Sequence, residues 1–527
     1  MADETKQDFS NDYARLVLGS TGISEPQGHS YGGVTKKITE EMVRCLWFGR
    51  YFDTARLYTE DGARLEIISP GRWNVEGGPD HLNAEILLEG AGRIKGDVEI
   101  HVSASDWHRH GHDRQEGYKN VCLHVVMWND SSQGYVRDMA NRNIPQLVLS
   151  KYVTIPPEEI PGLLDDLAGY PDAARYVAGP CRTILAKGNR NNEMLERILD
   201  HAGDERILSK ARRFEDYLGK RSYEQVLYEA LMRAMGYKNN ALQFSQLASL
   251  VPLEDLRRFV PMDAATEGES PIGRHVWIQS MLLGAGGFLS AWRNRDKEDY
   301  DPQTRAYIET LSGLWEEIRL ACDNNPKEPK ELMQYDDWHM SGVRPLNQPP
   351  RRIAAISHLL ARGLEGGVFK DLLTAIEEAR SKKAKSASTL TGNIETYFSG
   401  LEDKFWSHYL TPGGKRLKTP AKLIGRERAA AIFINVVLPL LLVYARRNHD
   451  ASLEVVLHEA YRGHRKGSTD SVVGFMTKRV LPERMSGIVS SARRQQGLHQ
   501  IFHDFCRRKD ISCDRCGVLK VLDAGAR

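Results

Sequence analysis

The chain has 527 residues, of which 41% are hydrophobic and 27% are charged, and its 72 Lys and Arg residues nearly balance its 70 Asp and Glu residues. This composition is typical of a globular protein and excludes a disordered chain, a collagen, a coiled-coil rod and a small disulfide scaffold. At about 150 residues per domain, the length predicts roughly three to four structural units.

The net charge of +2 conceals a difference between the two parts of the chain. Residues 1–160 carry 17 basic and 24 acidic residues, a net charge of −7, whereas residues 161–527 carry 55 and 46, a net charge of +9. An acidic part joined to a basic part is compatible with a metal site beside a surface that binds a polyanion.

The first 150 residues predict a mixed α and β domain. Residues 1–36 are polar and rich in Gly and Ser, which predicts a flexible arm. Helical periodicity begins near Ile38, and the pattern changes to strands after the Asp61-Gly62 turn signal. The strands and a short helix are predicted in the order 64–69, 82–88, 96–103, a helix within 105–118, 120–128 and 146–150. We therefore expect an α/β domain over residues 37–157, in the order helix, three-strand meander, helix and strand.

From about Pro161 the periodicity is helical nearly to the end of the chain. The clearest predicted helices are 192–201, 207–217, 223–235, 351–362 and 370–382. A Pro-rich loop at 344–350 divides this all-α part into regions 158–343 and 344–498, and a Cys-containing segment, 499–527, follows.

Two features bear on localisation. The apolar run Ala429–Ala445 has 17 residues, fewer than the ~20 of a membrane span, and predicts a buried helix. No signal-peptide pattern opens the chain, and its seven scattered cysteines do not resemble a disulfide framework. We expect a cytoplasmic protein that does not associate with membranes.

Histidines and carboxylates are concentrated between residues 80 and 124. The six histidines there are His81, His101, His108, His110, His112 and His124. Asp80 follows a Gly-Pro pair at the start of one predicted strand, and Glu99 and His101 point to one face of the next strand. If these strands are neighbours, Asp80 and Glu99 converge on one hard divalent cation, Mg²⁺ or Mn²⁺.

This arrangement resembles the PD-(D/E)XK nuclease superfamily. The resemblance rests on Pro79-Asp80, on Glu99-Ile100-His101 and on the order of the predicted elements. It implies that Asp80 and Glu99 bind the metal and that Glu41 is the upstream helix glutamate. His101 stands where the superfamily has a lysine that positions or activates water. An imidazole can act as a base near neutral pH, and it can also ligate a metal.

A wider set of motifs resembles a bacterial family of unknown function that is thought to belong to the same superfamily. The motifs lie at 66–71, 105–113, 118–126, 338–347, 434–439 and 494–498. The resemblance implies a restriction-endonuclease-like N-terminal domain followed by a large all-α region, but no substrate. His81 departs from it, because an aromatic residue is usual there. Supporting contacts to metal or phosphate are expected from Asp106, His108, His110, His112 and His124, and a solvated polar loop or a buried core histidine is the alternative.

Three cysteines lie close together near the C-terminus: Cys506, Cys513 and Cys516. His503 lies three residues before Cys506, so both are on one helical face. Three thiolates and one imidazole would complete a structural zinc site. An iron–sulfur cluster would instead need a fourth thiolate, from Cys45 or another distant cysteine. Free thiols are the third possibility, and we expect no catalytic role in any of the three cases.

Basic residues in the helical part are candidate phosphate contacts, which would bind nucleic acid through its backbone or shape. They are Lys210, Arg212, Arg213, Arg344, Arg351, Arg352, Arg446, Arg447, Arg493 and Arg494.

The favoured function at this stage is metal-dependent hydrolysis of nucleic acid. Asp80 and Glu99 would hold Mg²⁺ or Mn²⁺, and His101 would act on the attacking water. One alternative is an inactive nucleic-acid-binding or scaffold protein, because the usual lysine is absent. The other is a metal hydrolase for a small molecule, with a site built from His101, His108, His110, His112 and His124. The sequence predicts no oligomeric state.

Overall fold

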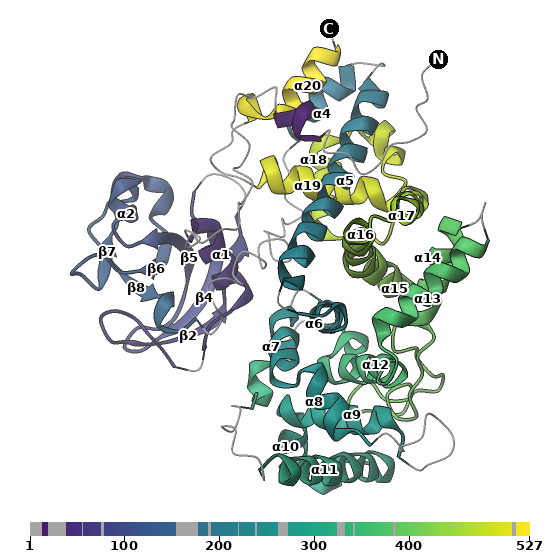
Figure 1. Cartoon of the computed structure of the whole chain (residues 1–527). Coiled ribbons are helices and arrows are strands. Elements are labelled where there is room, and N and C mark those ends of the chain that lie inside the picture. Colours follow the sequence, from purple (N-terminus) through teal and green to yellow (C-terminus); the bar gives the residue numbers. More distant parts are fainter. Residues whose placement is uncertain are drawn as a thin grey trace, which may run out of the picture. The chain divides into compact units, whose positions relative to one another are not determined.

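The computed structural model describes most of the chain (Figure 1). The described residues are 13–18, 38–54, 56–74, 78–153, 178–187, 191–219, 221–237, 240–261, 272–323, 332–340, 343–382, 386–507 and 513–526. They form two compact units, each of which is described by itself. One unit comprises Ile207–Gly467, and the other contains both Phe9–Arg206 and Ser468–Arg527.

This division differs from the predicted boundaries at residues 343 and 498. The Pro-rich loop at 344–350 connects helices of a single unit, in which α9 (Arg274–Ala285) packs against α12 (Pro349–Arg362). The C-terminal segment joins the unit that contains the N-terminal domain. The boundaries of the two units therefore follow from which helices pack together, and not from the position of the proline-rich loop.

The N-terminal domain begins with α1 (Glu40–Gly49), which starts where the Thr39 hydroxyl accepts a hydrogen bond from the Met42 N–H. An eight-stranded sheet follows, in the spatial order β1-β2-β4-β5-β6-β8-β7, with β3 beside β4. Its strands are β1 (Leu57–Tyr58), β2 (Arg64–Ser69), β3 (Arg72–Trp73), β4 (His81–Leu88), β5 (Gly92–Ser103), β6 (Val121–Trp128), β7 (Tyr135–Arg137) and β8 (Asn143–Val148).

The observed order of helix, three-strand meander, short helix and strand confirms the predicted α/β fold class. Strands β2, β4 and β5 form the antiparallel meander, and α2 (Asp106–Arg109) leads into β6, which runs parallel to β5. Strand β6 is buried on both faces except at Trp128, as is typical of a central strand with parallel neighbours. Helix α1 packs against β5 and β6 with its apolar side.

The predicted flexible arm is wrong for the part that the structure describes. Tyr13 and Val17 are buried, and residues Ala14–Leu18 form a helical turn against α20 (Gly517–Ala526). Apolar side chains from both ends of the chain thus share one core. The rest of residues 1–36 lies outside the described residues. The helices of this unit are α4 (Pro180–Lys187), the first part of α5 (Asn191–Leu218), α18 (Ser471–Val480), α19 (Ala492–Ile501) and α20.

The predicted helices 192–201 and 207–217 are parts of one helix, α5. The predicted helices 223–235, 351–362 and 370–382 are present in the helical unit, with ends shifted by up to two residues. Its remaining members are α6 (Tyr223–Met235), α7 (Ala241–Leu250), α8 (Leu253–Phe259), α10 (Phe288–Arg293), α11 (Pro302–Asp323), α13 (Val368–Ser381), α14 (Ser386–Ser399), α15 (Arg426–Ile432), α16 (Leu438–Arg447) and α17 (Ala451–Gly463). Helix α6 has the predicted bounds, with Ser222 as its N-cap and Gly236 just after its end.

The apolar run is part of a continuous helical segment, Arg426–Arg447. In the described part of the chain it is the one helix that is long and apolar enough to cross a membrane, and most of its apolar window is buried within the structure. It contains a π-helical turn, Phe433–Val437, just before Pro439. Proline has no N–H to donate to the preceding turn, which accounts for the irregularity.

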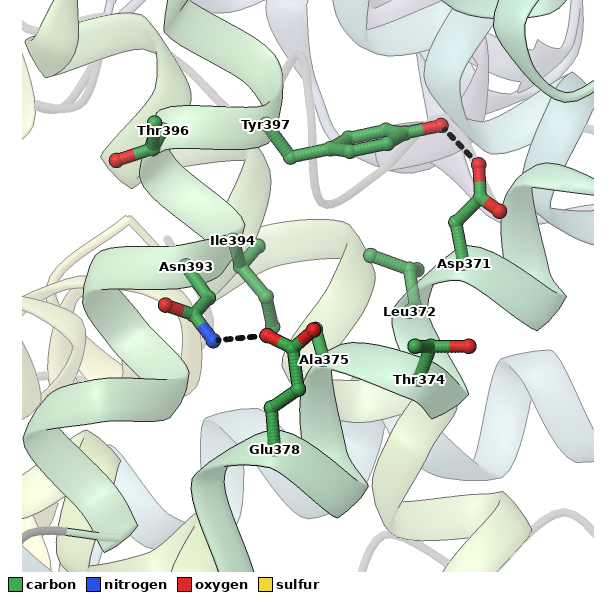
Figure 2. Close-up of a pocket in the computed structure, with 9 residues that line it drawn as sticks. All are labelled: Asp371, Leu372, Thr374, Ala375, Glu378, Asn393, Ile394, Thr396 and Tyr397. Atoms are coloured by element: carbon green, nitrogen blue, oxygen red, sulfur yellow. Dashed lines mark hydrogen bonds between the residues drawn. The ribbon is translucent and has the colours of Figure 1, made fainter. Parts of the chain in front are cut away.

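A pocket lies between α13 and α14 (Figure 2). Its polar side chains bond to each other: the Tyr397 hydroxyl donates to Asp371 Oδ2 (2.8 Å), and Asn393 donates to Glu378 Oε2 (3.2 Å). The pocket contains none of the predicted site residues.

Candidate metal centre

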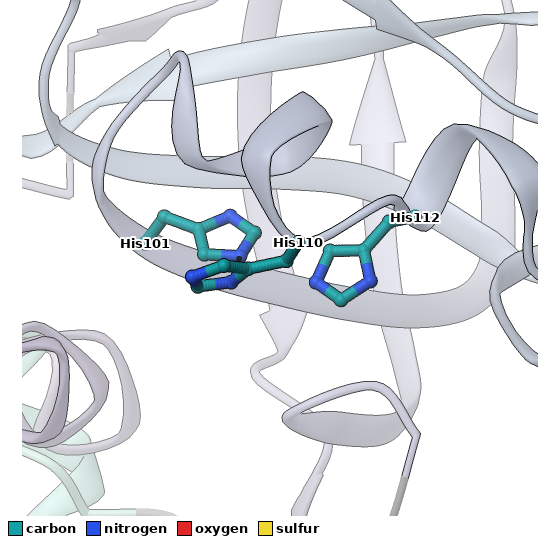
Figure 3. Close-up of side chains that lie close together, drawn as sticks. All are labelled: His101, His110 and His112. Carbon is teal, nitrogen blue, oxygen red and sulfur yellow. Dashed lines mark hydrogen bonds between the residues drawn. The ribbon is translucent and has the colours of Figure 1, made fainter.

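Three histidines converge at the sheet (Figure 3). His101 comes from β5, while His110 and His112 follow α2, and one ring nitrogen of each lies within 4.8 Å of the others. The His101 Nε2 and His110 Nδ1 atoms are 3.1 Å apart. His101 and His112 are buried, whereas His110 is exposed. A ligand can therefore reach this cluster from the side of His110.

The local backbone brings His110 and His112 to the same place. The Asp106 carboxylate accepts a hydrogen bond from the Ser103 N–H (3.1 Å), which anchors the start of α2. After this helix, Gly111 has a φ of 73°, a left-handed conformation that favours glycine and turns the chain sharply. The Gln115 amide then donates to the His110 carbonyl (3.0 Å). Asp106 thus supports the loop and also pairs with Arg109.

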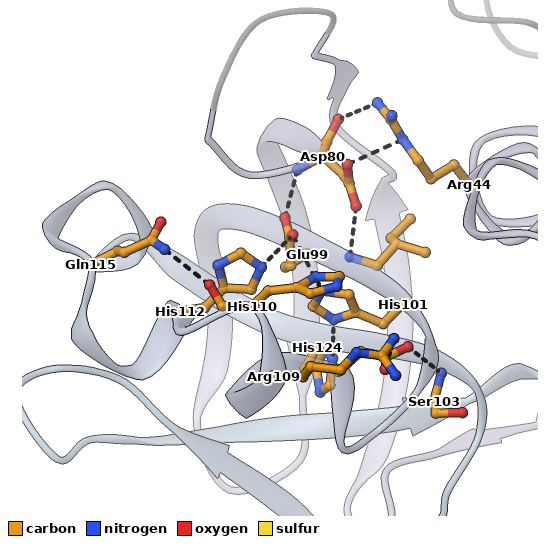
Figure 4. Close-up of polar contacts among 12 residues, drawn as sticks. Arg44, Asp80, Glu99, His101, Ser103, Arg109, His110, His112, Gln115 and His124 are labelled. Carbon is orange, nitrogen blue, oxygen red and sulfur yellow. Dashed lines mark hydrogen bonds and ion pairs between the residues drawn. The ribbon is translucent and has the colours of Figure 1, made fainter. Parts of the chain in front are cut away.

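The Glu99 carboxylate lies at the same cluster (Figure 4). Its Oε1 is 3.2 Å from His112 Nε2 and 3.7 Å from His101 Nε2. Glu99 is almost completely buried, and so are these two rings. The three imidazoles are thus close enough to share one cation, and the carboxylate oxygen lies beside two of them.

Asp80 and Glu99 meet across β4 and β5, as the sequence predicts. The Asp80 N–H donates to Glu99 Oε2 (2.9 Å), and the Ile100 N–H donates to Asp80 Oδ2 (2.9 Å). The other Asp80 oxygen, Oδ1, is 3.2 Å from Arg44 Nε on α1. Since both Asp80 oxygens already have protein partners, the geometry gives Asp80 a positioning role beside Glu99 more readily than a ligand role.

The buried Arg44–Asp80 pair is expected to be important for stability. Arg44 also donates to the Asn74 carbonyl (2.7 Å), and both charged side chains are almost fully buried. Replacing Arg44 by Met should lower the free energy of unfolding by about 3 kcal/mol, because it leaves the carboxylate buried without a counter-charge. Chemical denaturation measures this change. The matched control is Arg50→Met at the C-cap of the same helix, which removes one hydrogen bond to the Ile68 carbonyl. The prediction is contradicted if this control lowers the free energy of unfolding as much as Arg44→Met does.

His124, on β6, contacts the His101 ring. The His124 Nε2 and His101 Nδ1 atoms are 2.9 Å apart, and His124 Nδ1 is 3.1 Å from Gln146 Oε1. Burial lowers the pKa of His124 to about 3, an effect that the Gln146 contact only partly offsets. His124 is therefore neutral near pH 7, and its contact orients the His101 ring.

Two predicted residues lie in other contacts. His108 is exposed, and its Nδ1 is 3.4 Å from Asp113 Oδ2. Glu41 pairs with the buried Arg507, whose Nε is 2.8 Å from Glu41 Oε1.

Sequence reasoning missed two residues near the cluster, Tyr118 and Glu40. The Tyr118 ring stacks on His112, with centroids 3.8 Å apart. Burial raises the Tyr118 pKa, and the charges of Glu99, Asp80 and Glu40 raise it further, which places Glu40 rather than Glu41 within electrostatic range of the site. Glu40 and Glu41 are consecutive residues on the first turn of α1, so the sequence pattern does not show which of the two side chains faces the site.

Trp107 is a packing residue. It is fully buried with Tyr118 and Val121, and its indole N–H donates to the Arg137 carbonyl (2.9 Å). The unusual His81 is also buried, next to Trp73, with ring centroids 5.3 Å apart.

Two of the predicted phosphate contacts are internal. Arg351 donates to the carbonyls of Ala421 (2.7 Å) and Lys422 (2.9 Å), and Arg352 donates to that of Leu423 (2.6 Å). Burial and the charge of Arg352 together lower the pKa of Arg351 to about 10, and burial also lowers the pKa of Arg352. These side chains tie α12 to the segment 421–423 and do not face a phosphate.

Most of the other predicted contacts are also engaged within the protein. Lys210 is buried and donates to Asn435, and Arg494 Nε is 2.9 Å from Asp200 Oδ1. Further pairs join Arg493 to Asp204, Arg446 to Glu454 and Arg447 to Glu215. The exposed residues of the predicted set are Arg212, Arg344, Arg446 and Arg447, while Arg213 and Arg494 are half-buried. Lys210, Arg351, Arg352 and Arg493 are buried, so the prediction of a basic surface is wrong for these four.

A second group of potential ligands occurs in the helical unit: His275, His358 and Asp403. The Asp403 oxygens accept hydrogen bonds from His358 Nε2 (2.9 Å), Gln279 Nε2 (2.8 Å) and the N–H groups of Phe405 (2.8 Å) and Trp406 (2.7 Å). These contacts give Asp403 a structural role at the centre of a buried network.

The sheet, the helical unit and the histidine–carboxylate cluster define a mixed α/β protein with a candidate metal centre. The chain belongs to the family described as protein of unknown function (DUF2851), which matches residues 40–465. This match includes Asp80, Glu99 and the three histidines, and it ends before the C-terminal cysteines. No curated protein and no solved structure matches the chain.

Proposed function

We propose that the protein is a metal-dependent hydrolase that cleaves phosphodiester bonds of nucleic acid. The observation that carries the proposal is the convergence of the rings of His101, His110 and His112, with the Glu99 carboxylate beside two of them. A divalent cation held by such a set lowers the pKa of a bound water and offsets the charge of a phosphate oxygen.

The donor set favours one class of metal. Imidazole nitrogen suits Zn²⁺ and similar transition metals, carboxylate oxygen suits Mg²⁺ and Mn²⁺, and a mixed set accommodates Mn²⁺ or Zn²⁺. We therefore revise the proposed ligands from Asp80 and Glu99 to Glu99 and the three histidines. Asp80 holds Glu99 in place through its backbone N–H.

Phosphodiester chemistry is proposed on two grounds. Asp80 immediately precedes β4, and Glu99-Ile100-His101 lies on the neighbouring strand β5, against which α1 packs. This arrangement resembles the PD-(D/E)XK superfamily. Three exposed basic side chains also lie in the segment that carries the cluster, and each pairs with a neighbouring carboxylate: Arg109 with Asp106, Arg114 with Asp113 and Lys119 with Glu116. An anionic substrate would compete with these carboxylates for the basic groups.

The test is a cleavage assay with labelled single- and double-stranded DNA and RNA in Mn²⁺, Zn²⁺, Mg²⁺ or EDTA. We expect cleavage with Mn²⁺ or Zn²⁺ that EDTA abolishes and added metal restores. Binding of nucleic acid without turnover under every metal condition would contradict hydrolysis and would favour a scaffold role.

The second candidate is a metal hydrolase that acts on a small molecule. It is favoured by the internal positions of Lys210, Arg351 and Arg352, which remove much of the surface that a long polyanion would contact. A small activated phosphodiester, assayed beside the nucleic acids, separates the two candidates. Metal-dependent hydrolysis of this compound alone supports the small-molecule candidate.

A further inference from the structure

Four cysteines come together in the unit that contains both ends of the chain, although Cys181 is 325 residues before the next of them. Cys181 lies on α4, Cys506 follows α19, and Cys513 and Cys516 precede α20. Helices α4 and α20 pack against each other (Figure 1). Cys181 and Cys506 pack against the same apolar core, in which Cys516 is buried, and a turn joins Cys513 to Cys516, so the four cysteines lie in one region of the unit.

The backbone holds each cysteine in place. The Gly179 N–H donates to the Arg479 carbonyl (2.9 Å), and Arg182 donates to the Lys478 carbonyl (2.7 Å), so the start of α4 is tied to α18 on both sides of Cys181. Cys513 and Cys516 share a tight turn in which the Cys516 N–H donates to the Cys513 carbonyl (3.1 Å). This Cys-x-x-Cys turn directs two sulfurs to one point, as in thiolate metal sites.

The surroundings suit thiolates bound to a cation. The N–H groups of Val518 and Leu519, at the start of α20, donate to the Cys516 sulfur, and Lys520 is near it. Arg479 donates to the Cys506 sulfur. Four thiolates around a dication leave a net negative charge, which these donors and cations offset.

Cys516 is buried and the other three cysteines are half-buried. Thiolates shielded in this way suit a structural metal site, which is closed to solvent.

We propose that Cys181, Cys506, Cys513 and Cys516 together ligate one thiolate-bound metal centre, either zinc or an iron–sulfur cluster. Cys181 supplies the fourth ligand in place of His503, whose Nδ1 is 3.1 Å from Asp504 Oδ1. The centre links α4 to the C-terminal segment and is structural. It is independent of the hydrolase site.

The four cysteines are not among the described ligand groups that converge within 4.8 Å. Zn–S bonds of about 2.3 Å would hold the sulfurs of a zinc site about 3.8 Å apart, so zinc binding would draw the four side chains closer together.

The experiment measures metal content per chain in the full-length protein, purified anaerobically, by elemental analysis, acid-labile sulfide and visible absorbance. We expect one centre per chain: iron with sulfide identifies the cluster, and zinc alone identifies the mononuclear site. Cys181→Ser should lose at least 80% of the metal, as Cys513→Ser does. Cys122→Ser, a buried thiol on β6, and His503→Ala should retain it. Glu99→Gln should also retain it, which separates this site from the hydrolase site.

Thiol labelling of the wild-type protein keeps the test valid if a variant does not fold. Alkylation mapped by mass spectrometry should show that all four cysteines become reactive together when the metal is removed. The proposal is overturned if wild-type protein carries only trace metal, if Cys181→Ser retains the metal that Cys513→Ser loses, or if Cys181 labelling does not respond to metal removal. Loss of the metal in His503→Ala would also overturn it, because His503 would then be a ligand.

Discussion

Replacement of Glu99 by Gln is expected to reduce metal-dependent hydrolysis by about 10²–10³-fold. Glutamine has the size of glutamate and its side-chain oxygen can still accept from the Asp80 N–H, so the local fold should persist. It has no negative charge, however, with which to hold a cation beside His101 and His112. A loss of several kcal/mol of charge stabilisation corresponds to this decrease in rate, at about 1.4 kcal/mol for each factor of ten.

The measurements are kcat/KM at saturating Mn²⁺ or Zn²⁺ and the metal affinity by titration calorimetry. Both should fall in Glu99→Gln and in His112→Ala. His108→Ala is the matched control, since His108 lies in the same segment but is exposed and paired with Asp113. It should stay within about twofold of wild type, because surface changes away from a site have small effects. Wild-type activity in Glu99→Gln would exclude the proposed centre, provided that the unfolding temperatures of the proteins agree.

The largest effect on stability is expected from Asp403→Ala in the helical unit. Asp403 is 8% exposed and accepts hydrogen bonds from His358, Gln279 and two backbone N–H groups. Alanine would leave these donors buried without an acceptor, at about 1–3 kcal/mol each, and would create a cavity. The free energy of unfolding should therefore fall by at least about 5 kcal/mol, measured by chemical denaturation.

A matched control and the pH dependence sharpen this prediction. Asp371→Ala removes one hydrogen bond, which the Tyr397 hydroxyl donates, and should lower the free energy of unfolding by only about 1 kcal/mol.

Burial alone would raise the pKa of Asp403, but the His358 contact and the other donors outweigh it and lower the pKa to about 2. The stabilisation by the ionised carboxylate is thus present above pH ~4 and is lost between pH ~4 and ~2. The difference in stability between wild type and Asp403→Asn should narrow over that range, and a constant difference would contradict the assignment.

Local patterns were sufficient for much of the N-terminal domain. The alternation of apolar residues identified β2, β4, β5 and β6, since a strand that buries one or both faces must show it in its sequence. The period-two spacing of Glu99 and His101 put both side chains on the face where the three imidazoles gather. Short strands such as β1, β3 and β7 were missed, because two or three residues carry no measurable period.

Partners that are distant in sequence could not be predicted in the same way. The sequence around Arg351 and Lys210 gives no sign that these side chains are buried. A charged residue in a helix is expected at the surface unless its hydrogen-bond acceptors, here Ala421 and Asn435, are known. The boundary between the two units lies within α5 and could not be recognised from the sequence, because the helical pattern continues through it.

The sequence by itself determined the α/β class of the N-terminal domain, its helical continuation and the clustering of acids and histidines, because these depend on periodicity and composition. Only the tertiary structure decided that Asp80 faces Arg44, that Glu99 lies beside two of the three imidazoles, and that Cys181 packs in the same core as Cys506 and Cys516. The physical reason is that a ligand set depends on which surfaces pack together, and such packing is determined by burial over the whole chain rather than by neighbouring residues.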